Sequence, residues 1–202
     1  DSKVNETWIS AMLSQFNEET GGVNGVTHVE SKSIWTALQD MEWKNAISML
    51  KVLNDHYGPV TGIGNNMAVS RKAWESVGGL KSIKPSLTED HSLIRAITDM
   101  GFRVEQYFAA DGLATTQPEK NLTQLLSQRK RWMQGTHDLP FLLKFILFTL
   151  GIRVWPIVVL ISYSWLYGLI ALGITMVIDM IYHRKINFIL GTPSAGVCLW
   201  LF

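Results

Sequence analysis

Two adjacent carboxylates, Glu89 and Asp90, are the residues in this chain best suited to acid–base chemistry. They follow Thr88 at the start of a segment whose apolar residues recur at helical spacing until Gly101. A carboxylate beside a second acid, partly screened from water, can take a proton from a hydroxyl group as a general base. The alternative interpretation is structural, because Ser86 and Glu89 have the spacing of a capping box that only stabilises a helix N-terminus.

A second cluster lies at residues 128–132, where the sequence reads Gln-Arg-Lys-Arg-Trp. Gln128 and Arg131 are three residues apart and should share one face of a helix, with Trp132 beside them. Amide and guanidinium donors suit a diphosphate, and an indole ring offers a flat surface for a sugar. Cations and a tryptophan just before an apolar segment are also typical of a membrane boundary, so the interfacial interpretation stays open.

The ordered combination of the two motifs resembles the membrane-bound family 2 glycosyltransferases, the group that contains cellulose, chitin, hyaluronan and poly-N-acetylglucosamine synthases. Three stretches carry the resemblance: Thr88-Glu89-Asp90, Gln128-x-x-Arg131-Trp132, and the glycine- and asparagine-rich stretch that begins at Gly62. The resemblance covers most of residues 1–137. It implies an inverting transfer from a nucleoside-diphosphate sugar to a glycan or lipid-linked acceptor, in polysaccharide synthesis.

The same resemblance assigns roles to individual residues. Asp90 would be the general base, and Glu89 would hold the acceptor or orient that base. A larger set would bind the substrates: Gly64, Asn65, Asn66, Thr88, Gln128, Arg131 and Trp132.

Asp1 is a candidate metal ligand. In the family, an Asp-x-Asp motif ends a strand, and its last acid binds a divalent ion on the donor diphosphate. Asp1 stands where that last acid would stand, with the expected elements following it. Carboxylate oxygens suit Mg²⁺ or Mn²⁺, which bridge to phosphates and need few protein ligands. The alternative is that Asp1 caps a helix or is simply a chain end.

The segments that must position these residues alternate between helical and strand-like patterns, which predicts an α/β domain over residues 1–137. Helices are expected over residues 3–16 and from 34 to about 54, with strand-like runs at 23–29 and 102–108. A polar loop is expected at 115–119. The resemblance implies the C-terminal half of a GT-A, Rossmann-like nucleotide-sugar domain, without the half that would hold the base.

From Pro140 onward the chain is strongly apolar. Residues 138–151 are expected to form an interfacial helix, and residues 152–183 are long enough to cross a hydrocarbon core of ~30 Å. The cations at 183–185 would mark the far end of this span, and residues 186–202 would begin a second membrane segment. The resemblance places the catalytic domain on the cytoplasmic side of an integral membrane protein, in contact with membrane lipids.

Composition excludes other classes of protein. The net charge is +1, so the chain lacks the basic footprint of a nucleic-acid-binding protein. One cysteine cannot form a disulfide framework within the chain. The first residue is not methionine and the last lies in an apolar run, which predicts a fragment of a longer protein. A non-catalytic membrane scaffold or sugar-binding homologue is the rival interpretation, and the intact motifs weigh against it.

Overall fold

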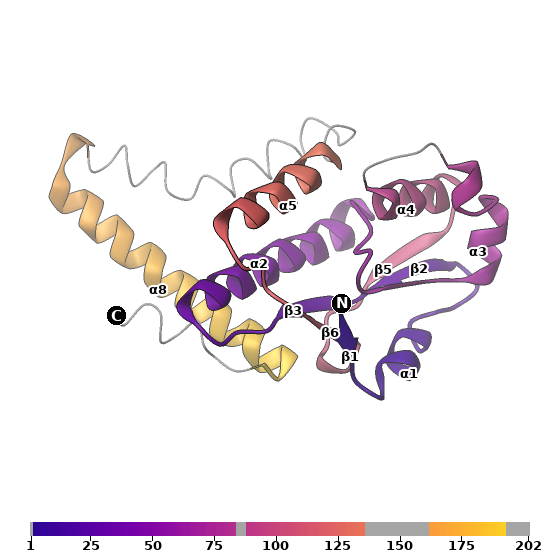
Figure 1. The fold of residues 1–202 in the computed structure, drawn as a ribbon, viewed down its shortest axis with the longest axis horizontal. Helices are drawn as coiled ribbons and strands as arrows, with labels where there is room; N and C mark the ends of the chain where they lie inside the picture. The colour runs from indigo at the N-terminus through magenta and orange to yellow at the C-terminus, as the bar shows by residue number, and fades with distance from the viewer. Residues whose placement is uncertain (1, 84–87, 136–161, 193–202) are drawn as a thin grey trace.

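The computed structural model of the chain describes residues 2–83, 88–135 and 162–192, with the side chains of 133–135 left out (Figure 1). Asp1, Ser86, the predicted interfacial helix at 138–151 and the first part of the predicted span lie outside these ranges.

The strands form two separate three-stranded sheets. Their bounds are β1 Lys3–Val4, β2 Thr20–Asn24, β3 Val26–Val29, β4 Met67–Val69, β5 Arg103–Gln106 and β6 Leu113–Thr116. One sheet has the order β1-β6-β3 and the other β4-β2-β5. Each sheet is mixed, because β3 and β6, like β2 and β5, run parallel, whereas β1 and β4 pair antiparallel with their neighbours.

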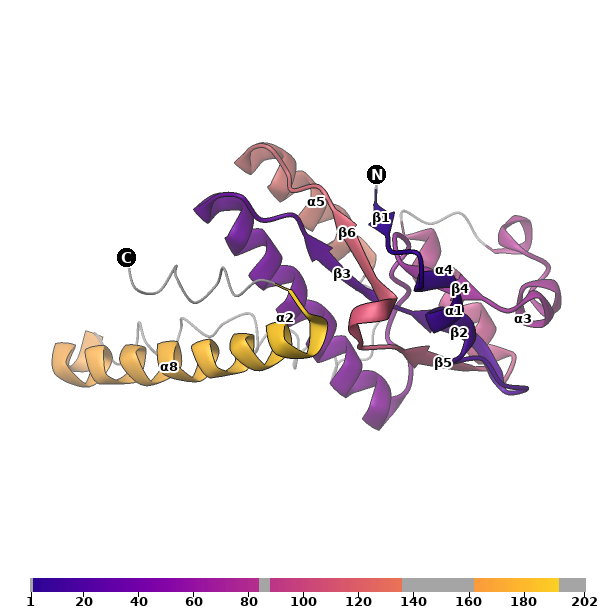
Figure 2. The same ribbon diagram turned by 90° about the horizontal axis from the view of Figure 1, so that it is seen from below.

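Helices cover these sheets and then extend away from them. Their bounds are α1 Trp8–Leu13, α2 Ile34–Tyr57, α3 Arg71–Ser76, α4 Glu89–Asp99, α5 Leu122–Gly135 and α8 Trp165–Leu190, with short 3₁₀ turns η1 Leu80–Ser82 and η2 Ala110–Gly112. Helix α2 packs on β3, and α3 and α4 pack on β2. Helix α5 lies beside α2, and α8 reaches α2 with its C-terminal end (Figures 1 and 2). The described residues therefore form the predicted α/β arrangement.

Two apolar clusters make up the core. One lies between α3, α4 and the β4-β2-β5 sheet, and its buried members are Ala73, Leu93, Ile94, Ile97 and Val104. The other joins β3, α2, the loop before β4 and α8, and its buried members are Val26, Ile47, Ile63, Ile186 and Leu190. The second cluster therefore takes two of its five buried residues from the last turns of the C-terminal helix.

Pairing over long range overrides three of the local predictions. The helix expected over residues 3–16 is instead the strand β1 followed by the six-residue α1, because Val4 pairs with Ala114. The loop expected at 115–119 begins with the end of β6, the central strand of its sheet.

The strand-like run at 23–29 is two strands in different sheets, separated at Gly25. A Cβ on Gly25 would lie 2.6 Å from the carbonyl oxygen of Gly112, so the chain must change direction at a residue without a side chain.

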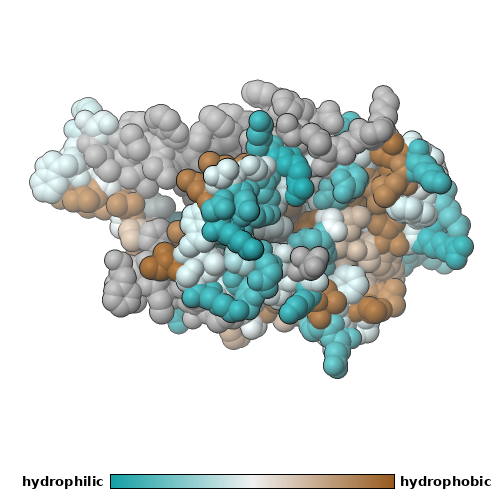
Figure 3. Space-filling view, in the orientation of Figure 1, coloured by the Kyte–Doolittle hydropathy of each residue, from teal (hydrophilic) through white to brown (hydrophobic). Residues whose placement is uncertain are grey.

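Helix α8 also departs from its predicted bounds. It continues through the cations at 183–185 to Leu190, and Gly191 ends it with a φ of 60° in the left-handed region. Residues 186–190 therefore belong to the same helix and not to a second segment. Trp165–Leu190 is the one helix in the described ranges that is long and apolar enough to cross a membrane. Figure 3 shows hydrophobic side chains along its visible part, whereas hydrophilic residues gather around the start of the chain.

Candidate active site

Asp90 lies in the first turn of α4 and is held by two backbone amides. Its Oδ2 accepts a hydrogen bond of 2.9 Å from the Gly64 N–H, and its Oδ1 accepts one of 2.8 Å from the His91 N–H. The side chain is partly buried, while Glu89 beside it is exposed. Two charge-assisted bonds orient the carboxylate, and lone pairs remain on both oxygens for another donor.

The start of α4 does not match the capping-box interpretation. The helix begins at Glu89, and its N-cap is Thr88, whose backbone is not helical. A capping box based on Ser86 would make Glu89 the third helical residue, but it is the first. Both acids therefore lie in the first turn, where the helix dipole favours negative charge.

Glycines in the loop before β4 allow α4 to approach closely. A Cβ on Gly62 would lie 2.6 Å from the backbone oxygen of Asp90, and one on Gly64 would lie 3.0 Å from its Oδ2. The buried side chain of Asn24 fixes this loop, since its Nδ2 donates to the Thr61 carbonyl at 3.0 Å and its Oδ1 accepts from the Ile63 N–H at 3.1 Å. The position of Asp90 is thus set by a loop with little freedom to move.

Asn66 holds this loop from beneath, which differs from its predicted contact with substrate. The residue is 2% exposed, and its Nδ2 donates to the carbonyls of Val26 at 2.7 Å and Gly112 at 3.0 Å. Its Oδ1 accepts from the Trp8 indole at 2.8 Å. Burial and three internal bonds leave no side-chain group directed to a ligand, so the predicted assignment of Asn66 to the substrate site does not fit the structure.

Asn65, in contrast, is exposed, as is Gly64. The Asn65 Oδ1 accepts from the Thr27 hydroxyl at 3.1 Å, and its Nδ2 donates to the Ser2 hydroxyl at 3.4 Å. Ser2 is thereby placed beside the loop that holds Asp90. Asp1, the candidate metal ligand, adjoins Ser2 in sequence but lies outside the described residues.

The structure divides the residues of the second cluster between two roles. The Gln128 Nε2 donates to Glu119 Oε1 at 2.8 Å, and its Oε1 accepts from Arg129. Arg131 is exposed, and within the described ranges it has no ion-pair partner. The expected pair of Gln128 and Arg131 facing one diphosphate is therefore not formed in this structure. Arg131 is available to an anion, whereas the amide of Gln128 is used within the protein.

Trp132 lies in the contact between α5 and α2. Its ring meets Trp43 edge-to-face at a centroid distance of 4.7 Å, and the Arg129 guanidinium lies 4.2 Å from its centroid. Arg129 also forms a fork with Glu42, with both N···O distances 2.6 Å. Arg129 therefore attaches α5 to α2 and covers part of the indole that was predicted to meet a sugar.

Three residues that organise these positions were not among the sequence predictions: Asn24, Glu42 and Arg129. An asparagine within a short valine-containing strand was the available signal for Asn24. Nothing local could have paired Arg129 with Glu42, because 87 positions separate them. In both ribbon views α5 runs alongside α2, in the same direction, toward the side where α4 begins, which brings the two motifs to one side of the domain (Figures 1 and 2).

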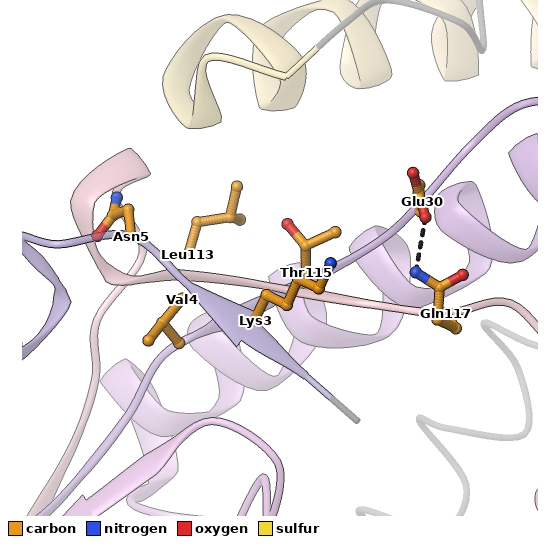
Figure 4. A pocket seen from close by; sticks show the side chains of 7 residues that line it. All are labelled: Lys3, Val4, Asn5, Glu30, Leu113, Thr115 and Gln117. Atoms are coloured by element: carbon orange, nitrogen blue, oxygen red, sulfur yellow. Dashed lines mark hydrogen bonds between the residues drawn. The ribbon is translucent and has the colours of Figure 1, made fainter.

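A separate hollow of about 360 Å³ is lined by residues of the paired strands β1 and β6 together with Asn5, Glu30 and Gln117 (Figure 4). Its lining contains one carboxylate, Glu30, which accepts from Gln117 at 2.6 Å and pairs with Lys32 at 2.7 Å. The hydrogen bonds from Lys32 and Gln117 lower the pKa of Glu30. A carboxylate engaged in this way is poorly suited to take a proton near neutral pH, so we do not assign chemistry to this hollow.

The part of the chain that the structure describes contains no group of three or more metal-ligating side chains. A single acid with a donor diphosphate is nevertheless compatible with Mg²⁺ or Mn²⁺, which keep water and phosphate oxygens as most of their ligands. The hydrogen bond between Asn65 and Ser2 brings the residue next to Asp1 to the loop that holds Asp90. Asp1 itself lies outside the described residues, so its role as the metal ligand stays a prediction.

In a comparison with known protein families, residues 9–202 match the family described as glycosyl transferase family group 2. The matched range includes both motifs, the glycine- and asparagine-rich loop before β4, and α8. No curated protein matches the chain.

Proposed function

Because the chain belongs to glycosyl transferase family group 2 and is therefore a glycosyltransferase, we propose that it transfers a sugar with inversion from a nucleoside diphosphate to a glycan or lipid-linked acceptor. The observation that carries the proposal is the placement of Asp90. Its carboxylate is oriented by Gly64 at the exposed start of α4, with lone pairs left for a substrate. The fold is proposed as the C-terminal half of a GT-A domain, and the parallel strand pairs with helices packed on them support it.

In the proposed reaction the acceptor hydroxyl attacks the anomeric carbon of the donor sugar. Its proton passes to Asp90 as the new C–O bond forms, and the bond to the diphosphate breaks on the opposite face of the ring. The nucleoside diphosphate leaves with the electron pair of that bond. Glu89, exposed one residue away, is placed to hold another acceptor hydroxyl.

The leaving diphosphate carries negative charge that must be stabilised. Arg131 is the exposed cation of the second cluster and is proposed to bind this group. A divalent ion held by Asp1, when bound, would neutralise further charge on the diphosphate. Trp132 is only partly buried, and the part of its ring left uncovered by Arg129 is proposed to contact the acceptor sugar.

The proposed setting is a membrane, with polysaccharide synthesis as the process. The support is α8, in which 6% of the residues in an apolar stretch of 18 are buried. An apolar helix that extends away from the domain with so little protein around it is suited to lipid. The catalytic domain is proposed to lie on the cytoplasmic side, where nucleotide sugars and Mg²⁺ would reach it, and membrane lipids are its immediate partners.

The proposal is tested with the full-length protein in membrane vesicles and a panel of radiolabelled nucleoside-diphosphate sugars. We expect one donor class to release nucleoside diphosphate together with transfer of label, and chelation with EDTA to stop both until Mg²⁺ or Mn²⁺ is restored. Vesicles without the protein are the control. Donor binding without release or transfer, under every metal condition, would instead support the non-catalytic sugar-binding homologue.

A further inference from the structure

Lys44, in the middle of α2, is 1% exposed and uses all of its donors within the protein. Its Nζ donates to Asp40 Oδ2 at 2.7 Å, to Asn187 Oδ1 at 2.7 Å and to the Thr192 hydroxyl at 2.9 Å. An ammonium group has three N–H bonds, and each of the three meets a different acceptor. We refer to Asp40, Lys44, Asn187 and Thr192 as the Lys44 cluster.

The cluster is anchored on the domain side through Asp40. Its Oδ1 lies 2.7 Å from His28 Nδ1 and accepts from the Val29 N–H at 3.0 Å. Burial alone would raise the pKa of Asp40, but the hydrogen bond from His28 and the charge of Lys44 outweigh burial and hold the pKa below its usual range. Asp40 is therefore a fixed anion that joins α2 to β3.

On the other side, the cluster holds the last turns of α8. Asn187 is 5% exposed and lies between Ile186 and Leu190, which pack with Ile47 and Ile63 in the second core cluster. Earlier parts of α8 are largely exposed, and in Figure 2 they extend away from the sheets. One end of the apolar helix is thus built into the core of the catalytic domain.

This docked end shares an apolar cluster with the loop of the candidate site. Ile63, which belongs to the same apolar cluster as Ile186 and Leu190 of α8, immediately precedes Gly64, whose N–H orients Asp90. Val26, in the same cluster, accepts the hydrogen bond from Asn66 that supports the loop. A shift of α8 along α2 would therefore move the backbone that positions the carboxylate.

A buried ion pair contributes little net stability compared with apolar residues of similar volume, because the desolvation of two charges offsets their attraction. The ammonium instead adds directional hydrogen bonds. Its acceptors lie on α2 (Asp40), on α8 (Asn187) and just after α8 (Thr192), so together they define one position of α8 along α2. We infer that Lys44 is a positioning residue, which locks the C-terminal end of α8 to α2 and so sets the loop that holds Asp90. This inference rests on the proposed function of Asp90.

The main test replaces the pair together, as Asp40→Asn with Lys44→Met, so that no buried charge is left alone. The control is Lys51→Met with Asp55→Asn, a pair on the same helix with the same residue types and spacing, but partly exposed. We expect kcat for transfer by the full-length enzyme to fall at least about tenfold in the test variant, because misplacement of a catalytic group by ~1 Å can lower the rate by about a hundredfold. KM for the donor should stay within about twofold, and the control should match wild type.

A second variant, Asn187→Leu, leaves Asp40 and Lys44 paired and removes only the acceptor on α8. The packing of α8 in this variant is measured independently of activity, by the reactivity of a thiol introduced as Leu190→Cys. Leu190 is 1% exposed, so the thiol should react only when the end of α8 leaves the core. The chain's single cysteine, Cys198, is first changed to serine. We expect the thiol of Leu190→Cys to react with a maleimide at least about tenfold faster when Asn187→Leu is also present, together with a lower kcat.

The two readouts give distinct outcomes. A lower kcat with faster labelling supports the inference. An unchanged kcat with faster labelling, or a lower kcat with unchanged labelling, overturns it, because docking and site geometry would then be independent. An unchanged kcat with unchanged labelling overturns it as well. Failure of the proposed role of Asp90 is recognised separately, since turnover would then persist in Asp90→Asn, and failure of the proposed function would appear as no transfer by the wild-type enzyme.

Discussion

Neighbouring residues of the same type have different roles in this protein, and the difference lies in what their polar atoms already bind. Arg129 is bound to Glu42 and stacked on Trp132, whereas Arg131, two positions later, is exposed. Asn66 is buried with three internal hydrogen bonds, whereas Asn65 is exposed and has two, one of them a long bond to Ser2. These contrasts provide matched pairs of substitutions.

The first pair separates nucleotide binding from helix attachment. Arg131→Ala should weaken binding of the nucleoside diphosphate product by about 1.5–3 kcal/mol, because it removes a charge-assisted contact. Arg129→Ala should mainly lower the melting temperature, since it leaves Glu42 without its partner and exposes Trp132. Titration calorimetry and thermal unfolding measure the two effects. Equal product affinity in wild type and Arg131→Ala would place that arginine at lipid headgroups instead.

The second pair concerns the loop that supports Asp90. Asn66→Ala should destabilise the protein by about 1–3 kcal/mol for each buried group left unpaired, the Trp8 indole N–H among them. Asn65→Ala should cost less, about 0.5–1.5 kcal/mol, because the side chain is exposed and water can replace it as the acceptor for the Thr27 hydroxyl. Thermal unfolding compares the two variants. A similar melting temperature for both would contradict the supporting role of Asn66.

At the scale of elements, the loop and the first turn of α4 act as one unit because they are in close contact. Gly62→Ala should force them apart, since the added methyl group would lie 2.6 Å from the Asp90 carbonyl oxygen. We expect lower turnover and a loss of about 1–3 kcal/mol, the usual range for overpacking. Gly173→Ala, where the added atom meets nothing within 4 Å, is the control. Wild-type turnover in Gly62→Ala would show that this contact does not position the base.

Helix α2 was predictable because its signal is local. The apolar period predicted a helix from Ile34 to about residue 54, and in the structure α2 begins at Ile34 and ends at Tyr57. Strands β1 and β6 were missed because they are two and four residues long and exist only through pairing with distant segments. A pattern of period two cannot be recognised in so few residues.

For the candidate site, too, the sequence indicated residue types and order but not the long-range contacts. Residue types and order, with the family resemblance, indicated Glu89, Asp90 and Arg131. The hydrogen bond between Gly64 and Asp90 spans 26 positions, and the one between Arg129 and Glu42 spans 87. Contacts of this range depend on the tertiary fold, and the internal use of Asn66 and Gln128 could be learned only from the structure.

At the scale of the whole molecule, the docking of α8 predicts its direction in a membrane. Because its C-terminal turns lie in the core of the domain, a crossing by α8 would put its Trp165 end on the opposite side of the bilayer from the domain. Tyr163 is 91% exposed, so an impermeant maleimide should then label Tyr163→Cys from one side of sealed vesicles. Arg71→Cys, on the domain surface, should be labelled from the other side by an impermeant maleimide.

In that experiment both variants are made in a Cys198→Ser background, and permeabilised vesicles show that each thiol can react. Labelling of both cysteines from the same side of sealed vesicles would contradict a crossing by α8. It would favour a helix that lies on the membrane surface or packs against another protein.

The most direct test of the central claim is turnover of the full-length enzyme with Asp90→Asn. Asparagine keeps the size of the side chain and an oxygen that can accept from Gly64, but it cannot take a proton from the acceptor. We expect turnover to fall by at least ~10²-fold, the scale for loss of a general base, with donor affinity unchanged. Asp99→Asn, at the other, exposed end of α4, should behave as wild type. Near-normal turnover in Asp90→Asn would contradict the assignment of Asp90 as the base.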